Sequence, residues 1–110
     1  MKKIVMIMLA ATVTALGAGV VLAEGEALDG ATLYKKRTCF TCHGADAKTP
    51  ILPTFPKLAG QNAEYALQQM KDIKSGARAN GQSVAMKAVM HLVTDDEMKL
   101  IAEYVSELEP

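Results

Sequence analysis

Residues 39 to 43 of this chain read Cys-Phe-Thr-Cys-His, and this CxxCH motif constrains the fold more than any other feature of the sequence. It contains both cysteines of the chain and one of its two histidines. Two thiols separated by two residues can each form a thioether bond with a vinyl group of one haem, and the adjacent histidine can ligate the iron. The motif therefore predicts one haem c, attached covalently at Cys39 and Cys42 and ligated by His43.

Three other interpretations of the cysteines fit the sequence less well. A zinc site normally has four ligands, and outside the motif only His91 and scattered carboxylates remain. A thioredoxin-like redox pair needs a βαβ context, which the pattern of this chain does not indicate. A structural disulfide between residues three apart would close a very small loop, so its entropic benefit would be slight.

The N-terminus predicts an export signal. A positively charged start is followed by an apolar stretch, and Val21-Leu22-Ala23 forms a small-residue cleavage site. An uncleaved membrane anchor is the alternative, because residues 4–22 carry no charge and are nearly long enough to span a bilayer. We predict a cleavable signal peptide at residues 1–23, one domain at residues 24–110 and a periplasmic location, which agrees with the extracytoplasmic attachment of haem c in bacteria.

The predicted mature domain is small and nearly neutral. Cleavage removes Lys2 and Lys3 and leaves all twelve acidic residues, so the net charge is about −2 and gives no sign of nucleic-acid binding. A domain of this size has a marginal hydrophobic core on its own. We expect a buried haem to supply the missing apolar volume, and the chain without haem to be poorly folded.

Hydrophobic spacing predicts helices throughout the mature domain. The predicted helical segments are residues 27–38, 63–75, 82–90 and 95–108, with approximate ends. Asn62 and Gly76 are expected to cap the second helix, and Thr94 with Glu97 predicts a capping box for the last. Residues 44–61 contain three prolines and predict an irregular loop. The predicted fold class is all-α, with three to five short helices around the haem.

These features resemble the class I c-type cytochromes, in particular the short soluble bacterial members with one haem. The resemblance covers essentially the whole mature chain, and it rests on the CxxCH motif, GATLY at 30–34, FPKLAGQ at 55–61 and the last helix. It implies the small cytochrome c fold, in which the first and last helices cross. Gly30 matches the small residue at that crossing, and Tyr34 and Tyr104 match the aromatic residues that pack beside it.

The resemblance also implies residues that support the haem. The Pro56 carbonyl is expected to accept the Nδ1–H of His43, which fixes the tautomer and strengthens the ligand. Leu58 is expected to pack on the haem face. Arg78 is a candidate partner for a haem propionate, because its guanidinium matches a carboxylate, with an exposed loop arginine as the alternative.

For the sixth ligand the resemblance implies a methionine, which raises the reduction potential relative to a second histidine. Met70 and Met98 lie within predicted helices and are interpreted as core residues. Met86 and Met90 lie just before the last helix, where the family presents its ligand, and the spacing favours Met86 over Met90. His91 or an open position are the remaining alternatives.

The expected function is that of a periplasmic one-electron carrier, not an enzyme, with periplasmic or membrane-bound redox proteins as donor and acceptor. An alternative is a dedicated cytochrome subunit of a periplasmic oxidoreductase, associated with a dehydrogenase subunit. An enzyme or gas sensor with an open iron position is a third hypothesis, which applies if no methionine ligates. The basic residues near the motif are a candidate docking surface for an acidic partner, with a solvated face as the alternative: Lys35, Lys36, Arg37, Lys48 and Lys57.

Overall fold

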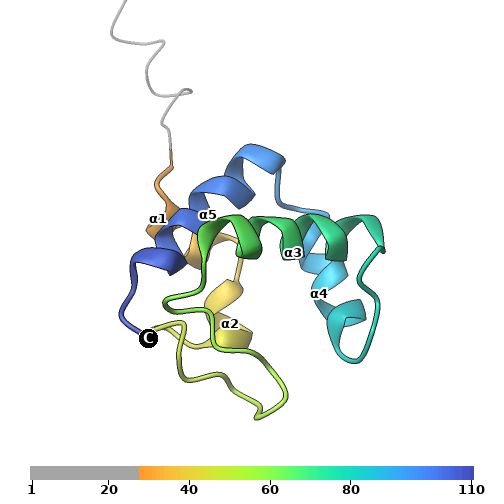
Figure 1. The fold of residues 1–110 in the computed structure, drawn as a ribbon, viewed down its shortest axis with the longest axis horizontal. Helices are drawn as coiled ribbons and strands as arrows, with labels where there is room; N and C mark the ends of the chain where they lie inside the picture. Colours follow the sequence, from red (N-terminus) through yellow and green to blue (C-terminus); the bar gives the residue numbers. More distant parts are fainter. Residues whose placement is uncertain (1–27) are drawn as a thin grey trace, which may run out of the picture.

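The computed structural model describes residues 28–110. These residues form five helices, α1 (Gly30–Lys36), α2 (Cys39–His43), α3 (Ala63–Ser75), α4 (Ser83–Met90) and α5 (Asp95–Glu107) (Figure 1). Within this part of the chain there is no β-strand, and none of the five helices is both long and apolar enough to cross a bilayer. The prediction of an all-α fold is confirmed. The predicted signal peptide, residues 1–23, lies outside the described residues.

The first helix is shorter than the sequence predicts. It begins at Gly30 because the Asp29 side chain caps it, accepting a hydrogen bond from the Thr32 amide at 2.7 Å. It ends at Lys36, and Thr38 then adopts a left-handed backbone conformation with φ of 62°. This turn interrupts the helix, so the CxxCH motif forms the separate helix α2.

The other three helices begin and end close to the predicted residues. The Asn62 side chain accepts from the Tyr65 amide at 3.0 Å at the start of α3, and Gly76 ends that helix in a left-handed conformation. At the start of α5, Thr94 and Glu97 form the predicted capping box, in which each side chain accepts from the other's amide. These caps are local, so the sequence alone is enough to predict them.

Helices α1 and α5 cross at Gly30. A Cβ atom there would overlap the Leu100 carbonyl and the Tyr104 side chain, so the two backbones come this close only because residue 30 is glycine. Beside the crossing, the ring centroids of Tyr34 and Tyr104 lie 5.7 Å apart with the planes tilted by 56°. Helix α3 packs against both α5 and α4. The crossing is the one that the resemblance implies.

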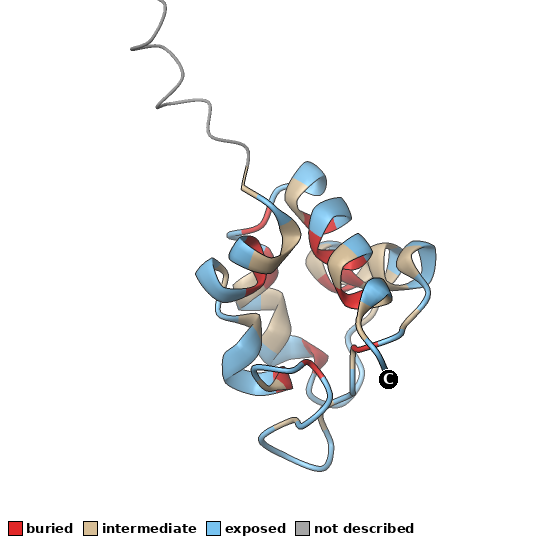
Figure 2. Cartoon of the chain, turned by 90° about the vertical axis from the view of Figure 1, so that its left-hand side faces the viewer, coloured by how far each residue is buried: buried red, intermediate tan, exposed pale blue. Residues whose placement is uncertain are grey.

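The buried side chains lie on the inward faces of the helices and at a few loop positions (Figure 2). The apolar ones are Leu33, Tyr34, Ala47, Ala59, Met70, Ile73, Met90, Val93, Met98, Ile101, Ala102 and Val105. They do not fill the interior. A cavity of about 380 Å³ lies between α2, α3, α4, α5 and the long loop at residues 44–62.

Candidate functional site

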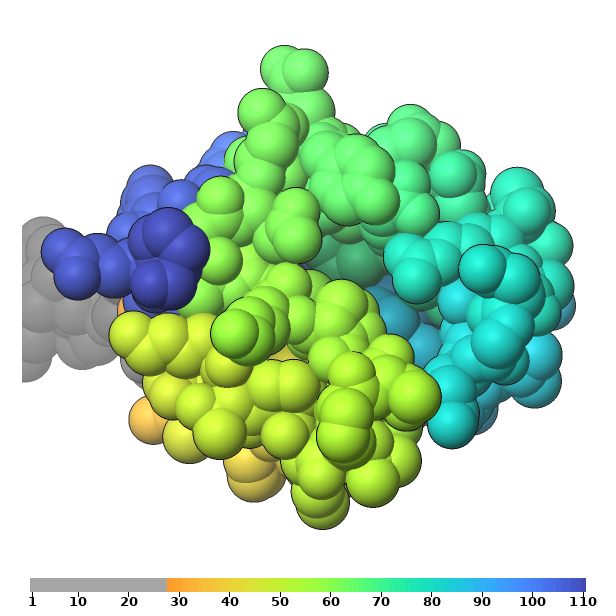
Figure 3. Space-filling view, turned by 60° about the horizontal axis from the view of Figure 1, so that its bottom comes forward, coloured from red at the N-terminus to blue at the C-terminus, as the bar shows by residue number. Residues whose placement is uncertain are grey.

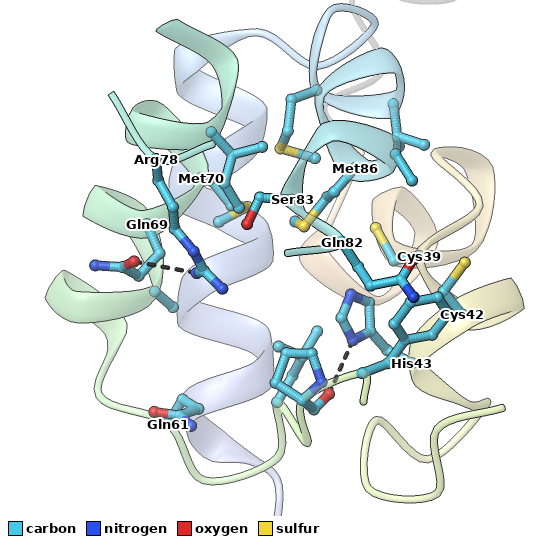
Figure 4. A pocket seen from close by; sticks show the side chains of 18 of the residues that line it. Cys39, Cys42, His43, Gln61, Gln69, Met70, Arg78, Gln82, Ser83 and Met86 are labelled. Carbon is cyan, nitrogen blue, oxygen red and sulfur yellow. Dashed lines mark hydrogen bonds between the residues drawn. The ribbon is translucent and has the colours of Figure 1, made fainter. Parts of the chain in front are cut away.

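Helix α2 brings both cysteines and the adjacent histidine to the cavity. Cys39, Cys42 and His43 are three and four residues apart, and this spacing places them on one face of a helical turn. All three line the cavity, and Figure 4 shows them on the same side of it. Burial raises the pKa of the Cys39 thiol to about 11, whereas Cys42 is exposed. The three residues of the predicted attachment motif therefore meet at one place.

The His43 ring is buried in a fixed orientation. Its Nδ1 lies 2.9 Å from the Pro56 carbonyl oxygen, the contact that the resemblance implies. Because a carbonyl oxygen only accepts, Nδ1 carries the proton and Nε2 retains a lone pair. Burial lowers the pKa of His43 below its ordinary value, although the hydrogen bond to Pro56 acts in the opposite direction. The side chain is thus a neutral imidazole with Nε2 available to a metal.

Backbone hydrogen bonds fix the loop that presents the Pro56 carbonyl. The Ala47 carbonyl accepts from the Leu58 amide at 2.7 Å and from the Ala59 amide at 3.0 Å. Ala47 is fully buried and has a left-handed φ of 59°, so this position holds the loop against the rest of the domain. Leu58, which is expected to face the haem, is half-buried and lines the cavity.

Met86 enters the cavity from α4 (Figure 4). Of the four methionines in residues 28–110, it alone is half-buried, whereas Met70, Met90 and Met98 are buried in the core. Met70 and Met90 also contribute to the cavity wall, and Met98 does not. His91, the alternative ligand, is exposed and is not among the residues that line the cavity.

Polar side chains gather at another part of the cavity wall. The Arg78 Nη1 donates to Gln69 Oε1 at 3.1 Å, and both side chains line the cavity (Figure 4). The buried Ser83 also lines the cavity, and Gln82 lines it on the side of Cys39 and Cys42 (Figure 4). A guanidinium held at the cavity wall by an amide oxygen suits a carboxylate on a bound group. The sequence indicates Arg78 but not Gln69 or Ser83, because helical spacing does not distinguish a polar residue facing a cavity from one facing solvent.

The cavity has the size and lining of a cofactor site. Its volume of about 380 Å³ lies in the range of about 300 to 1,000 Å³ that is typical of small-molecule sites, and most of its wall is apolar. Figure 3 shows it open to the surface between the 44–62 loop and the segment that leads into α4. Two thiols, a neutral imidazole and a thioether meet there, and these are the groups that covalent attachment and axial ligation of a haem require.

The family model described as Cytochrome c matches residues 27–109, nearly all of the part of the chain that the structure describes. The chain belongs to the cytochrome c family. Members of this family bind haem c and carry electrons. The resemblance that the sequence indicates is therefore confirmed. Haem binding, the property shared by the family, agrees with the size and lining of the cavity in this cytochrome.

Curated cytochromes are similar to this one over much of its length. Cytochrome c-553 from Nitratidesulfovibrio vulgaris (strain DSM 19637 / Miyazaki F) is 31% identical over 108 residues, which cover 98% of this chain and 100% of that protein. Cytochrome c4 from Pseudomonas aeruginosa is 41% identical over 86 residues, which cover 78% of this chain and 40% of that protein. The thiosulfate dehydrogenase electron acceptor from Stutzerimonas stutzeri is 36% identical over 86 residues, which cover 72% of this chain and 38% of that protein. This cytochrome therefore spans about two fifths of the length of the last two proteins.

Proposed function

We propose that this cytochrome carries single electrons in the periplasm through one haem c, attached at Cys39 and Cys42 and ligated by His43 and Met86. The observation that carries the proposal is the convergence of these four side chains, from α2 and α4, on one cavity (Figure 4). The bound haem iron supplies a ferrous–ferric couple. The chain has a single CxxCH motif, which supports one haem per chain.

Residues around the cavity have positions that suit a haem which transfers electrons. The hydrogen bond from His43 to Pro56 orients the imidazole and makes it a more basic ligand. The apolar lining, which includes Ile73 and Val105, would shield a bound haem from water. Arg78 would pair with a propionate and thereby neutralise its charge. Because the fold would hold both His43 and Met86 in place, little would have to rearrange when the oxidation state of a bound haem changes.

The assignment of Met86 is tested by two leucine variants of the haem-loaded protein. Leucine nearly conserves the volume of methionine but has no sulfur, so the packing change alone is expected to cost less than about 1.5 kcal/mol in either variant, and Met86→Leu loses the bond to iron in addition. Met86→Leu is expected to lose the weak long-wavelength absorption band of a ferric iron–methionine bond and to bind carbon monoxide when reduced. Met90→Leu is the matched control and is expected to retain the band.

The same spectra separate the alternatives. Loss of the band only in Met90→Leu would assign the ligand to Met90. A wild-type protein that lacks the band and binds carbon monoxide readily has an open iron position, and it would favour a sensor or an enzyme over a carrier.

The periplasmic location and the single haem are tested together by the mass of the protein purified from a periplasmic extract. The expected mass is that of residues 24–110 plus one haem. This expectation rests on the cleavage pattern at Val21-Leu22-Ala23. A membrane-bound product that retains residues 1–23 would instead support the anchor.

A narrower candidate function is that of a cytochrome which serves one oxidoreductase. It is favoured by the similarity to a protein named as a thiosulfate dehydrogenase electron acceptor. A periplasmic dehydrogenase is then the expected partner, and the cytochrome should co-elute with it from a native extract. Elution as a lone monomer, with reduction by several unrelated donors, would favour a general carrier.

A further inference from the structure

Tyr34 makes a hydrogen bond that helix packing does not require. Its ring is only 1% exposed and packs against Tyr104 beside the crossing of α1 and α5. The sequence predicts a packing role alone. The hydroxyl, however, extends past the crossing and donates to the Gly44 carbonyl oxygen at 2.7 Å. Gly44 directly follows His43, so this bond attaches the helix crossing to the end of the haem-attachment motif.

From Gly44 a series of backbone hydrogen bonds leads back to His43. The Gly44 carbonyl also accepts from the Ala47 amide at 3.1 Å, and the Ala47 carbonyl accepts from the Leu58 amide at 2.7 Å. Two residues before Leu58 is Pro56, whose carbonyl accepts the His43 Nδ1–H at 2.9 Å. These hydrogen bonds and the residues between them form a continuous path that begins and ends at His43.

Among the residues in this series of hydrogen bonds, Gly44 is the one whose backbone is least restricted by its own side chain. It has φ of 89°, and a Cβ atom at this position would overlap the Thr49 carbonyl, so only glycine fits. Glycine has no side chain with which to restrict its own backbone. The Tyr34 hydroxyl supplies that restriction from a rigid ring buried in the core.

We propose that Tyr34 is a positioning residue for His43: its hydroxyl holds the Gly44 carbonyl and thereby keeps the Pro56 carbonyl at hydrogen-bonding distance from Nδ1. This inference rests on the proposed function, because it requires His43 to ligate the haem iron. A well-formed bond from Nδ1 makes the imidazole a more basic ligand and favours ferric over ferrous iron. Loss of the Tyr34 hydroxyl therefore raises the reduction potential.

The test compares Tyr34→Phe with Tyr104→Phe in the haem-loaded protein. Both keep the aromatic pair, but within residues 28–110 the Tyr104 hydroxyl makes no hydrogen bond. Tyr34→Phe is expected to shift the ferric–ferrous equilibrium about threefold toward ferrous, or roughly 30 mV, since a tenfold change corresponds to 59 mV for one electron. Exchange of the His43 Nδ1 proton with solvent, followed by NMR, is expected to be faster in this variant alone. Equal potentials and exchange rates in both variants would overturn the proposal.

A second test applies if Tyr34→Phe does not accumulate with haem. In a Tyr65→Phe, Tyr104→Phe background, which removes the tyrosine that lines the cavity, the remaining Tyr34 is replaced by 3-fluorotyrosine, whose hydroxyl is a stronger donor on a ring of nearly the same size. Within the described residues only Tyr34 donates a hydrogen bond through its hydroxyl, so a lower potential and slower Nδ1 exchange support the proposal, while unchanged or opposite shifts refute it. Failure of the proposed function is distinguishable, because a wild-type protein without histidine ligation shows this in its own spectrum.

Discussion

Gly44 has a backbone φ of 89°, and a Cβ atom there would overlap the Thr49 carbonyl. Alanine at this position would combine the cost of a backbone conformation that is essentially confined to glycine (φ 89°, ψ 156°), about 1 to 3 kcal/mol, with displacement of the loop. We expect Gly44→Ala to lower the free energy of unfolding of the haem-loaded protein by about 3 kcal/mol or more, as measured by urea denaturation. Gly81→Ala is the control, because Gly81 has φ of 54° with no atom within 4 Å of its would-be Cβ. It should lose only about 1 kcal/mol, and equal losses at both sites would contradict the steric argument.

The same residues show what a sequence can reveal of a site. The spacing of Cys39, Cys42 and His43 is the spacing that covalent haem attachment requires, so the sequence alone predicts the role of the motif. The Pro56 contact follows from the resemblance to a family. The bonds of Tyr34 to Gly44 and of Arg78 to Gln69 join residues ten and nine positions apart across turns. Their partners depend on how those turns fold, and no periodicity encodes that.

Among the helices, predictability depends on whether the ends are set locally. Helices α3 and α5 begin at side-chain caps that lie within three residues of the amides they satisfy, and the sequence predicts both starts. The break between α1 and α2 depends on a left-handed Thr38, a conformation that threonine rarely adopts. The sequence carries no signal for it, so the first helix is predicted too long.

An ion pair links the end of α1 to the start of α5. Arg37 Nη2 lies 2.7 Å from Glu97 Oε2, and Glu97 also accepts from the Thr94 amide. Partial burial acts to raise the pKa of Glu97, but the hydrogen bonds from Arg37 and Thr94 outweigh it and lower that pKa below the ordinary 4.5. A carboxyl group with a lowered folded-state pKa stabilises the fold above its unfolded-state pKa, and this stabilisation is lost as the pH falls through the folded-state value.

Glu97→Gln is therefore expected to destabilise the protein by about 1 kcal/mol at neutral pH, because the charge is lost while the cap acceptor remains. The difference from wild type should shrink as the pH falls below about 4, where the wild-type carboxyl becomes protonated. Urea denaturation at several pH values measures it, with Glu103→Gln on the exposed face of α5 as control. A difference that stays constant with pH would exclude the ion pair as its cause.

The whole molecule is a set of short helices arranged around a cavity, and its core is continuous with the cavity wall. Met70, Ile73, Ile101 and Val105 are buried, yet each also lines the cavity. The half-buried Leu58, Ala66, Met86 and Val89 line the same cavity, and without a bound group they would face water across the opening that Figure 3 shows at the surface. The small size of the chain predicts this dependence on haem, but the sequence alone does not show which core residues share their packing between protein and cofactor.

Removal of the haem is therefore expected to remove the cooperative fold. The helices contain seven, five, thirteen, eight and thirteen residues, and isolated helices shorter than about 12 to 15 residues are marginal in water. A variant with both Cys39→Ala and Cys42→Ala cannot form either thioether bond. We expect its circular dichroism to show reduced helicity and a broad thermal transition without a calorimetric peak. Each single variant keeps one thiol for attachment and serves as control, with a cooperative transition wherever haem is retained. A cooperative, wild-type-like transition in the haem-free double variant would show that helix packing alone is sufficient to form this fold.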